Sequence, residues 1–184
     1  MNDISLEAPA VSSESSSGFS IVIDTDDPEP PDLAWLESKA QAILGRLDLR
    51  HVALSVVVID DARMSQMHEQ FSGVPGTTDV LTFDLLDASE LDPDQEIDVV
   101  EGEIYICLDE ARRRASELDH EAATELLLYI THGILHLVGY DDHSPEEWRQ
   151  MHEAEDRLLE QIGVGAVFNR DRNAEFDKVA VDES

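Results

Sequence analysis

Two histidines four residues apart are the feature of this sequence best suited to chemistry. His132 and His136 lie in a strongly helical stretch, and side chains at this spacing project from one face of a helix with their Cβ atoms about 5–6 Å apart. Two imidazoles placed in this way can hold one metal ion, at roughly 2.0–2.1 Å from each nitrogen when the ion is zinc. The pair therefore marks a candidate metal site.

A third histidine follows the expected end of this helix. Gly139 suits the left-handed turn that ends many helices, and the chain can then fold back to bring His143 to the same ion. Three neutral nitrogens with a fourth position left for water describe an open zinc site of the catalytic kind. Such an ion lowers the pKa of its bound water to about 7. We therefore expect His132, His136 and His143 to be the metal ligands.

The remaining histidines and the residue after His132 narrow the kind of site. A metalloprotease of the HExxH type needs a glutamate next to its first histidine as general base, and Gly133 occupies that position. This counts against a protease. The other four histidines show no comparable arrangement, and we interpret them as surface or packing residues: His51, His68, His120 and His152.

The elements that must position these residues change in kind along the chain. Apolar and β-branched runs predict short strands at residues 19–23, 52–59, 80–83 and 104–108. Helical spacing predicts helices at residues 33–47, 60 to about 73, 109–118, 121–137 and 145–162. Ser144 can cap the last helix in a capping box with Glu147. Strands early and helices late predict an α+β fold, a small mixed sheet of about four strands packed with about five helices in a single domain.

A stretch rich in acids separates the last two predicted strands. Residues 84–103 contain nine acidic residues and no Lys or Arg. We interpret the stretch as a solvated loop, with a metal or partner site as the alternative.

The composition limits the function classes. The chain has 184 residues, 12 of them basic and 42 acidic, so its formal net charge is −30. A generic basic nucleic-acid binder is excluded as a first hypothesis, since nothing here builds a broad positive surface. Arg112, Arg113 and Arg114 form the one basic cluster. We interpret this cluster as a solvated helix face with acidic partners, and as an alternative it supplies a local basic spot for phosphate.

The cysteine count, the apolar runs and the polar ends of the chain indicate the compartment and the domain limits. The single cysteine, Cys107, excludes an intramolecular disulfide framework and a cysteine-rich zinc finger. The sequence has no apolar run of about 18 residues and no basic-then-apolar leader, so we expect a soluble, cytoplasmic protein. The hydrophobic content of 42% suffices for a core. Polar composition predicts a disordered tail over residues 1–18 and a flexible tail over 165–184, around a domain at 19–164.

Three collinear segments resemble the YbeY family of bacterial rRNA maturation factors. Residues 132–141 match the family signature His-Gly-x-Leu-His-Leu-x-Gly-Tyr-Asp-His up to its last position. Residues 78–83 (Thr-Asp-Val-Leu-Thr-Phe) are similar to the family's Thr-(Asn/Asp)-Val-Leu-Ser-Phe strand. Residues 102–113 resemble its Gly-Asp-Ile-x-Ile-x-Leu-x-x-Ala-Arg segment. The resemblance extends over residues 19–163.

The resemblance implies a function, a cofactor and partners. It implies a zinc-dependent endoribonuclease that acts on single-stranded RNA, with one Zn²⁺ per chain, in maturation of the 3′ end of small-subunit (16S) rRNA and in ribosome quality control. The implied partners are ribosomal RNA and the small subunit or its associated proteins, with no membrane and no DNA. Two other functions stay open. One is a ribosome-assembly or binding factor with a structural zinc and weak or no cleavage, and the other is a metal-dependent hydrolase of a different small substrate.

The chain departs from the family pattern at two places. Asp142 stands where the signature has its last histidine, and His143 follows one residue later. We keep His143 as the third ligand, with Asp142 as a hydrogen-bond acceptor or as the ligand in its place. Ser72 stands where the family has an arginine that is thought to contact RNA phosphate or stabilise charge in the transition state. This second departure favours the assembly-factor alternative.

Overall fold

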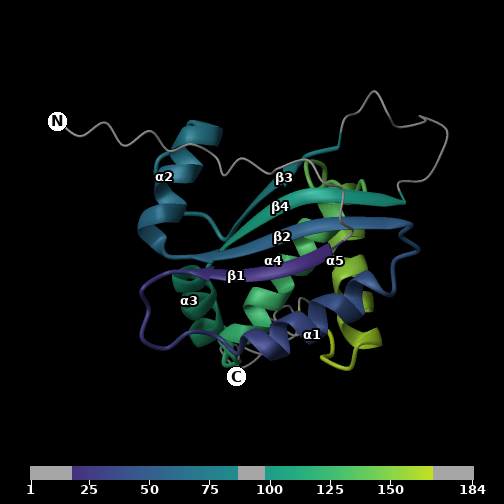
Figure 1. The fold of residues 1–184 in the computed structure, drawn as a ribbon, viewed down its shortest axis with the longest axis horizontal. Coiled ribbons are helices and arrows are strands. Elements are labelled where there is room, and N and C mark those ends of the chain that lie inside the picture. Colours follow the sequence, from purple (N-terminus) through teal and green to yellow (C-terminus); the bar gives the residue numbers. More distant parts are fainter. Residues whose placement is uncertain (1–17, 87–97, 168–184) are drawn as a thin grey trace, which may run out of the picture.

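The computed structural model describes residues 18–86 and 98–167, and within them it confirms the α+β class (Figure 1). The four strands are β1 (Gly18–Asp24), β2 (His51–Ile59), β3 (Val80–Asp84) and β4 (Val99–Cys107). The five helices are α1 (Leu33–Leu44), α2 (Asp61–Ser72), α3 (Leu108–Leu118), α4 (Ala122–Leu137) and α5 (Pro145–Gln161). The two predicted tails lie almost wholly outside the described residues. At their inner limits, Gly18 belongs to β1 and Val167 is buried.

The strands form one mixed sheet in the order β1-β2-β4-β3. The pairs β1–β2 and β2–β4 are parallel, and β3 runs antiparallel to β4 at one edge. Val56 of β2 lies opposite Ile21 and Ile104 on its two neighbours. All three side chains are buried, so this register aligns the apolar residues of the sheet on one face.

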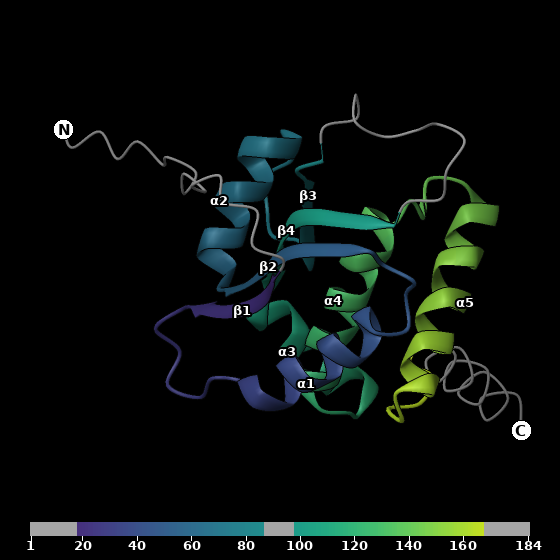
Figure 2. The same ribbon diagram turned by 45° about the vertical axis from the view of Figure 1, so that its right-hand side comes forward.

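The helices cover the two faces of the sheet unequally. Helices α1, α3 and α4 lie against one face with α5 beside α4, whereas α2 lies alone over the other (Figures 1 and 2). The larger core lies under the four helices and includes Leu36 of α1 and Ile130 of α4. The smaller core lies under α2 and consists of Ile59, Met64, Tyr105 and Cys107, which is a free thiol. Because α2 covers little of its face, part of the sheet stays accessible there.

Strand β4 corrects one prediction from the sequence. The strand expected at residues 104–108 begins five residues earlier, at Val99, and ends at Cys107. The last residues of the stretch predicted to be a solvated loop therefore pair with β2, starting from Val99 opposite His51. Glu101 and Glu103 alternate with the buried residues of this strand, which is the pattern of a half-covered strand. The first part of the strand was predicted as loop because its outward-facing side chains are acidic. Residues 87–97 of the same stretch lie outside the described part.

The helix boundaries follow their capping residues. The Asp60 side chain accepts a hydrogen bond from the Arg63 amide at the start of α2, and Gly73 ends the helix in the left-handed conformation with φ 72°. Helix α1 ends at Leu44 instead of the predicted residue 47. At α5 the predicted capping box is present, with Ser144 and Glu147 each accepting a hydrogen bond from the other's backbone N–H. This box fixes the turn between α4 and α5, which carries the remaining candidate ligands.

Candidate metal site

Helix α4 carries the two histidines and lies very close to the sheet. A Cβ atom on Gly133 would lie 2.8 Å from Cδ1 of Ile104 on β4, so any other residue here would push the Ile104 side chain aside. His132 and His136 then face a cleft of about 460 Å³ between α4, the turn after it and strand β3. The residues of β3 that line the cleft include Val80, Leu81 and Thr82. The sequence-predicted pair is thus brought together at the edge of the sheet.

The hydrogen bonds of the two rings define their protonation. The Nε2 atoms of His132 and His136 are 2.9 Å apart. His132 Nδ1 lies 2.7 Å from Oε1 of Glu155, and His136 Nδ1 lies 3.1 Å from the carbonyl oxygen of Tyr140. A carboxylate and a carbonyl only accept, so both Nδ1 atoms carry a proton, and the two Nε2 atoms face each other.

This arrangement fits a bound cation. A metal ion held by His132 and His136 would take up the Nε2 lone pairs, which otherwise meet each other or share one proton. Neutral imidazoles whose other nitrogen donates to an oxygen acceptor are the usual protein ligands of zinc. The donor set of His132 and His136 therefore matches the metal that the sequence predicts.

In the turn that follows α4, Asp142 lies closer to the histidine pair than His143 does. Oδ2 of Asp142 lies 3.7 Å from His132 Nε2. The ligand atoms of His132, His136 and Asp142 all lie within 4.8 Å of one another. His143 lies on the outer side: its side chain is 84% exposed, and its Nδ1 is 3.5 Å from the other carboxylate oxygen of Asp142. The structure thus brings Asp142 to the histidine pair, and His143 as a ligand stays a prediction.

Glu155 on α5 belongs to the site and was missed by sequence reasoning. It is 1% exposed, and it holds His132 through Oε1 and Nδ1 of His152 through Oε2, at 2.7 and 2.6 Å. Burial alone would raise the pKa of Glu155, but the hydrogen bonds of the two histidines hold it below its usual value. A signal for it exists in the sequence. Glu155 lies on the apolar stripe of α5 next to Ala154 and one turn from Met151, where a charged residue needs a buried partner.

The same contacts shift the pKa values of the two rings in opposite directions. Burial alone would lower the pKa of His132, but its hydrogen bond with Glu155 raises it above the usual value. Burial lowers the pKa of His136, and the neighbouring His132 lowers it further. His136 is therefore the ring better kept neutral, as a metal ligand must be.

The cleft itself is acidic. Asp79, Asp84 and Asp142 line it, and no Lys or Arg is found among the described residues of its wall. A phosphate group entering this cleft would therefore meet no fixed positive charge from the described chain, and the metal ion would be the main source of attraction.

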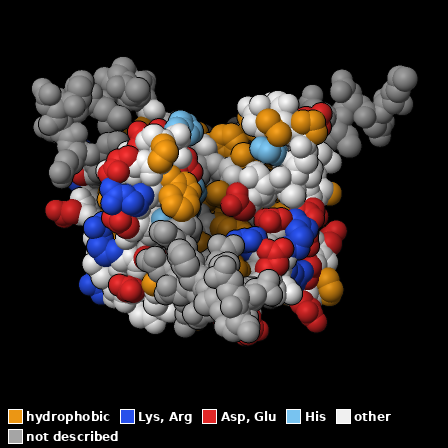
Figure 3. Space-filling model, turned by 180° about the vertical axis from the view of Figure 1, so that it is seen from behind, with side chains coloured by type: hydrophobic (Ala, Val, Ile, Leu, Met, Phe, Trp, Pro, Cys, Tyr) orange, Lys and Arg blue, Asp and Glu red, His pale blue; other side chains and the backbone are white. Residues whose placement is uncertain are grey.

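The arginine cluster of α3 is engaged elsewhere. Arg112 pairs with Asp27, Arg113 binds Asp61 and Glu110, and Arg114 binds Glu117. The guanidinium of Arg113 lowers the pKa of Asp61 to about 2. These contacts agree with the interpretation as a helix face with acidic partners, two of which lie outside the helix. On the face shown in Figure 3, Lys and Arg side chains lie next to acidic ones and form no separate basic patch.

The other residues singled out from the sequence lie away from the cleft wall. Ser72 is the last residue of α2, and its hydroxyl donates to the carbonyl oxygen of His68 at 2.5 Å. His68 Nδ1 contacts the Gly76 carbonyl oxygen, and His120 pairs with Glu125 at 2.6 Å. His51 lies 3.4 Å from Glu101. Of the four histidines interpreted as packing or surface residues, only His152 therefore contacts the site, through Glu155.

One further feature of the described chain concerns membranes. None of the helices that the structure describes combines the length and the apolar composition needed to cross a bilayer.

Comparison with known proteins places these features in a family. The family model described as Endoribonuclease YbeY matches residues 29–163. A Mycobacterium ulcerans protein named Endoribonuclease YbeY is 35% identical over 158 residues, which cover 81% of this chain and 87% of the relative. A Mycobacterium tuberculosis protein of the same name is 34% identical over 160 residues, covering 82% and 89%. The solution structure of TM1509 from Thermotoga maritima is similar with a TM-score of 0.52 and 26% identity, over 78% of this chain and 91% of that one.

Proposed function

This chain belongs to the YbeY family of endoribonucleases, and from that premise we propose that it is a zinc-dependent endoribonuclease acting on single-stranded RNA. Its substrate is the 3′ end of small-subunit (16S) rRNA, in maturation and in ribosome quality control. It acts in the cytoplasm, with ribosomal RNA and small-subunit proteins as partners and without membrane or DNA. The observation that carries the proposal is the pair of Nε2 atoms 2.9 Å apart, each ring fixed through its Nδ1.

The residues of the chain have distinct parts in this function. A bound Zn²⁺ supplies Lewis-acid polarisation of a phosphate oxygen and a water of lowered pKa. His132 and His136 hold one ion per chain, and Glu155 fixes the ring of His132. Strand β3 and the turn after α4 bound the cleft. Its volume of about 460 Å³ is that of a small-molecule pocket, which suits a short length of single strand better than a duplex.

The third ligand comes from the turn after α4, and the distances favour Asp142 over the sequence-based choice, His143. If Asp142 is the ligand, Asp142→Ala weakens zinc binding far more than His143→Ala. Competition with a chromogenic chelator measures both affinities. The reverse order would establish His143 as the ligand, with Asp142 as its hydrogen-bond acceptor.

The cleavage assay uses a labelled RNA carrying the 3′ end of 16S rRNA, offered as a single strand and annealed to its complement. We expect chelator-stripped protein to be inactive, zinc to restore cleavage, and the single strand to be cut faster. His136→Ala should be inactive with either substrate. Equal cleavage of strand and duplex would contradict the single-strand preference.

A second function is favoured by one observation of the cleft. No Lys or Arg lies in its described wall, and Ser72 replaces an arginine of the family, so phosphate is held weakly. The alternative is a ribosome-assembly or binding factor with a structural zinc. Protein that binds one zinc and associates with small subunits, yet cleaves no RNA offered, would favour this alternative over the nuclease.

A further inference from the structure

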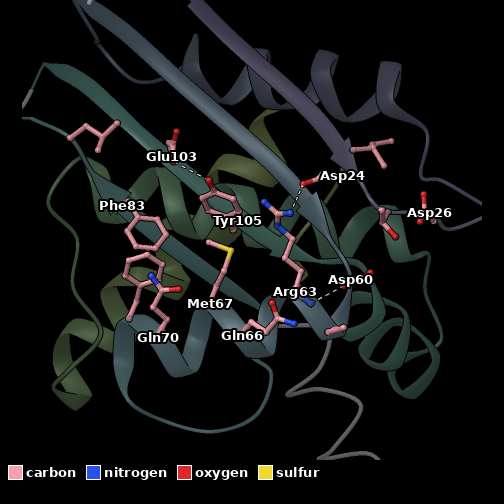
Figure 4. A pocket seen from close by; sticks show the side chains of 15 residues that line it. Asp24, Asp26, Asp60, Arg63, Gln66, Met67, Gln70, Phe83, Glu103 and Tyr105 are labelled. Carbon is pink, nitrogen blue, oxygen red and sulfur yellow. Dashed lines mark hydrogen bonds and ion pairs between the residues drawn. The ribbon is translucent and has the colours of Figure 1, made fainter. Parts of the chain in front are cut away.

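A second and larger cavity lies on the opposite face of the sheet, under α2. This groove measures about 850 Å³ and is lined by residues of β1, α2, β3 and β4 (Figure 4). Among the described residues, none that lines the groove also lines the metal cleft. The groove is therefore a separate surface feature that the proposed nuclease function does not use.

The floor of the groove is apolar and partly exposed. Met67, Phe83 and Tyr105 point into it (Figure 4). Phe71 packs edge-on against Phe83 with ring centroids 4.8 Å apart and is still 55% exposed, and Leu85 at the margin is 53% exposed. Exposed hydrophobic side chains gathered in one hollow are typical of a binding surface.

The ends of the groove are acidic. Glu103 lies at one end of the apolar floor, and Asp24, Asp26 and Asp60 lie toward the other (Figure 4). Arg63 is the one Lys or Arg among the described lining residues, and it pairs with Asp24 at 3.1 Å. Four carboxylates against one paired guanidinium give the groove a net negative charge at both ends.

The geometry points to a cationic polypeptide segment as the occupant of this groove, with an apolar or aromatic side chain on the floor and Lys or Arg residues on both sides of it. The apolar floor fits the central anchor, and the acids at the two ends fit the flanking cations. Anchors of this kind, desolvated at the centre of a polar rim, carry most of the affinity in protein interfaces. The complementary charges steer the encounter and select the partner.

An RNA strand fits the same groove poorly. The aromatic rings of Phe71 and Phe83 could stack with bases, but each phosphate would face carboxylates and a guanidinium that is already paired. Nucleic-acid affinity depends on cations that neutralise phosphates. Charge complementarity therefore favours a basic protein segment over a nucleic acid.

The test measures binding of a defined peptide to the full-length protein by fluorescence anisotropy. The probe is a labelled peptide with a Leu-Phe-Leu centre flanked on each side by Lys-Arg-Lys. Two control peptides of equal length replace either the flanking cations by Glu or the apolar centre by Ser. We expect the probe to bind with an affinity that falls as salt is added, and both controls to bind more weakly.

Removing an acidic side chain from the groove and removing its arginine should change the affinity for the probe in opposite directions. Asp26→Asn and Glu103→Gln should each weaken probe binding roughly two- to five-fold, and Phe71→Ser about ten-fold. Arg63→Gln removes the competing cation and should strengthen binding. The matched control is Glu153→Gln, which removes one exposed carboxylate of α5 outside the groove and should leave binding unchanged. Circular dichroism and thermal unfolding show whether each variant is folded.

Three results would overturn the proposal. The first is that the wild-type protein binds the probe no better than the two control peptides. The second is that the groove variants, shown to be folded, bind like Glu153→Gln. The third is that a labelled single-stranded oligonucleotide binds here in place of the peptide, with Arg63→Gln weakening its binding and Glu103→Gln strengthening it. None of these results depends on zinc or on RNA cleavage, so the proposal stands or fails apart from the nuclease function.

Discussion

At the scale of single residues, Glu155 joins two histidines at the candidate metal site, His132 and His152. Its carboxylate is buried between His132 and His152, so it fixes the tautomer and direction of the His132 ring, one of the two proposed metal ligands. Partners of this kind orient metal ligands and increase their basicity. Asp142 has a different part, because one of its oxygens faces the histidine pair and the other faces His143.

The substitution Glu155→Gln tests this positioning role. The amide still fills the space but loses the charge that holds His132, so zinc affinity should fall about 10- to 100-fold. Competition with a chromogenic chelator measures it. Glu153→Gln on the same helix is the matched control, since that carboxylate is exposed and pairs only with Arg149 among its described neighbours. A variant at position 155 with the affinity of this control would contradict the role.

At the scale of elements, the close contact of α4 with β4 places both histidines at the edge of the sheet. Gly133→Ala inserts a Cβ 2.8–3.0 Å from three atoms of the buried Ile104. Overpacking of this kind costs about 1–3 kcal/mol, which the better helix propensity of alanine offsets by about 1 kcal/mol. Urea unfolding should therefore show a modest loss of stability.

A double variant separates crowding from other causes. Ile104→Val removes Cδ1, the atom nearest the new Cβ, so Gly133→Ala should be less destabilising in this background than in the wild type. Simple additivity of the two losses would contradict the packing argument.

The contact between α2 and α3 gives a prediction about acid. Arg113 lowers the pKa of Asp61 from 3.8 to about 2, so the stabilisation is fully present above pH 3.8 and is lost as the pH falls through about 2. The pKa difference corresponds to about 2.5 kcal/mol, reduced to about 1 kcal/mol by solvent because the Asp61 side chain is 40% exposed.

Urea unfolding of Asp61→Asn against pH measures this contribution. The variant should be less stable than the wild type at pH 7, and the difference should shrink as the pH approaches 2. The exposed Asp48, changed to Asn, serves as the control. A difference that is the same at both pH values would show that the charge of Asp61 is not its cause.

Elements were easier to predict from sequence than the details of the site. The 3.6-residue period locates α4 and so pairs His132 with His136, because local spacing alone brings them together. Which residue of the turn joins them depends on backbone conformation after Gly139, which spacing does not determine. Strand β4 was predicted too short because its outward residues are acidic. Glu155 was missed because His132, the ring that it fixes, lies on another helix.

At the scale of the whole molecule, the two faces of the sheet carry two separate hollows. The helical face ends in the metal cleft, and the face under α2 holds the acidic groove. With a net charge of −30, the protein would repel RNA at long range, so under the proposed function the attraction for phosphate would come mainly from an ion held in the cleft. A bound cationic segment would reduce this repulsion as well as filling the groove.

The most direct test of the central claim is the rate of single-stranded RNA cleavage as zinc is titrated into chelator-stripped protein. The account predicts no cleavage without metal, a linear rise in rate and saturation at one equivalent per chain. His136→Ala should show no rise, and His68→Ala, which changes a partly buried histidine of α2 outside the cleft, should follow the wild type. Cleavage that is independent of added zinc, or that persists in His136→Ala, would contradict the account.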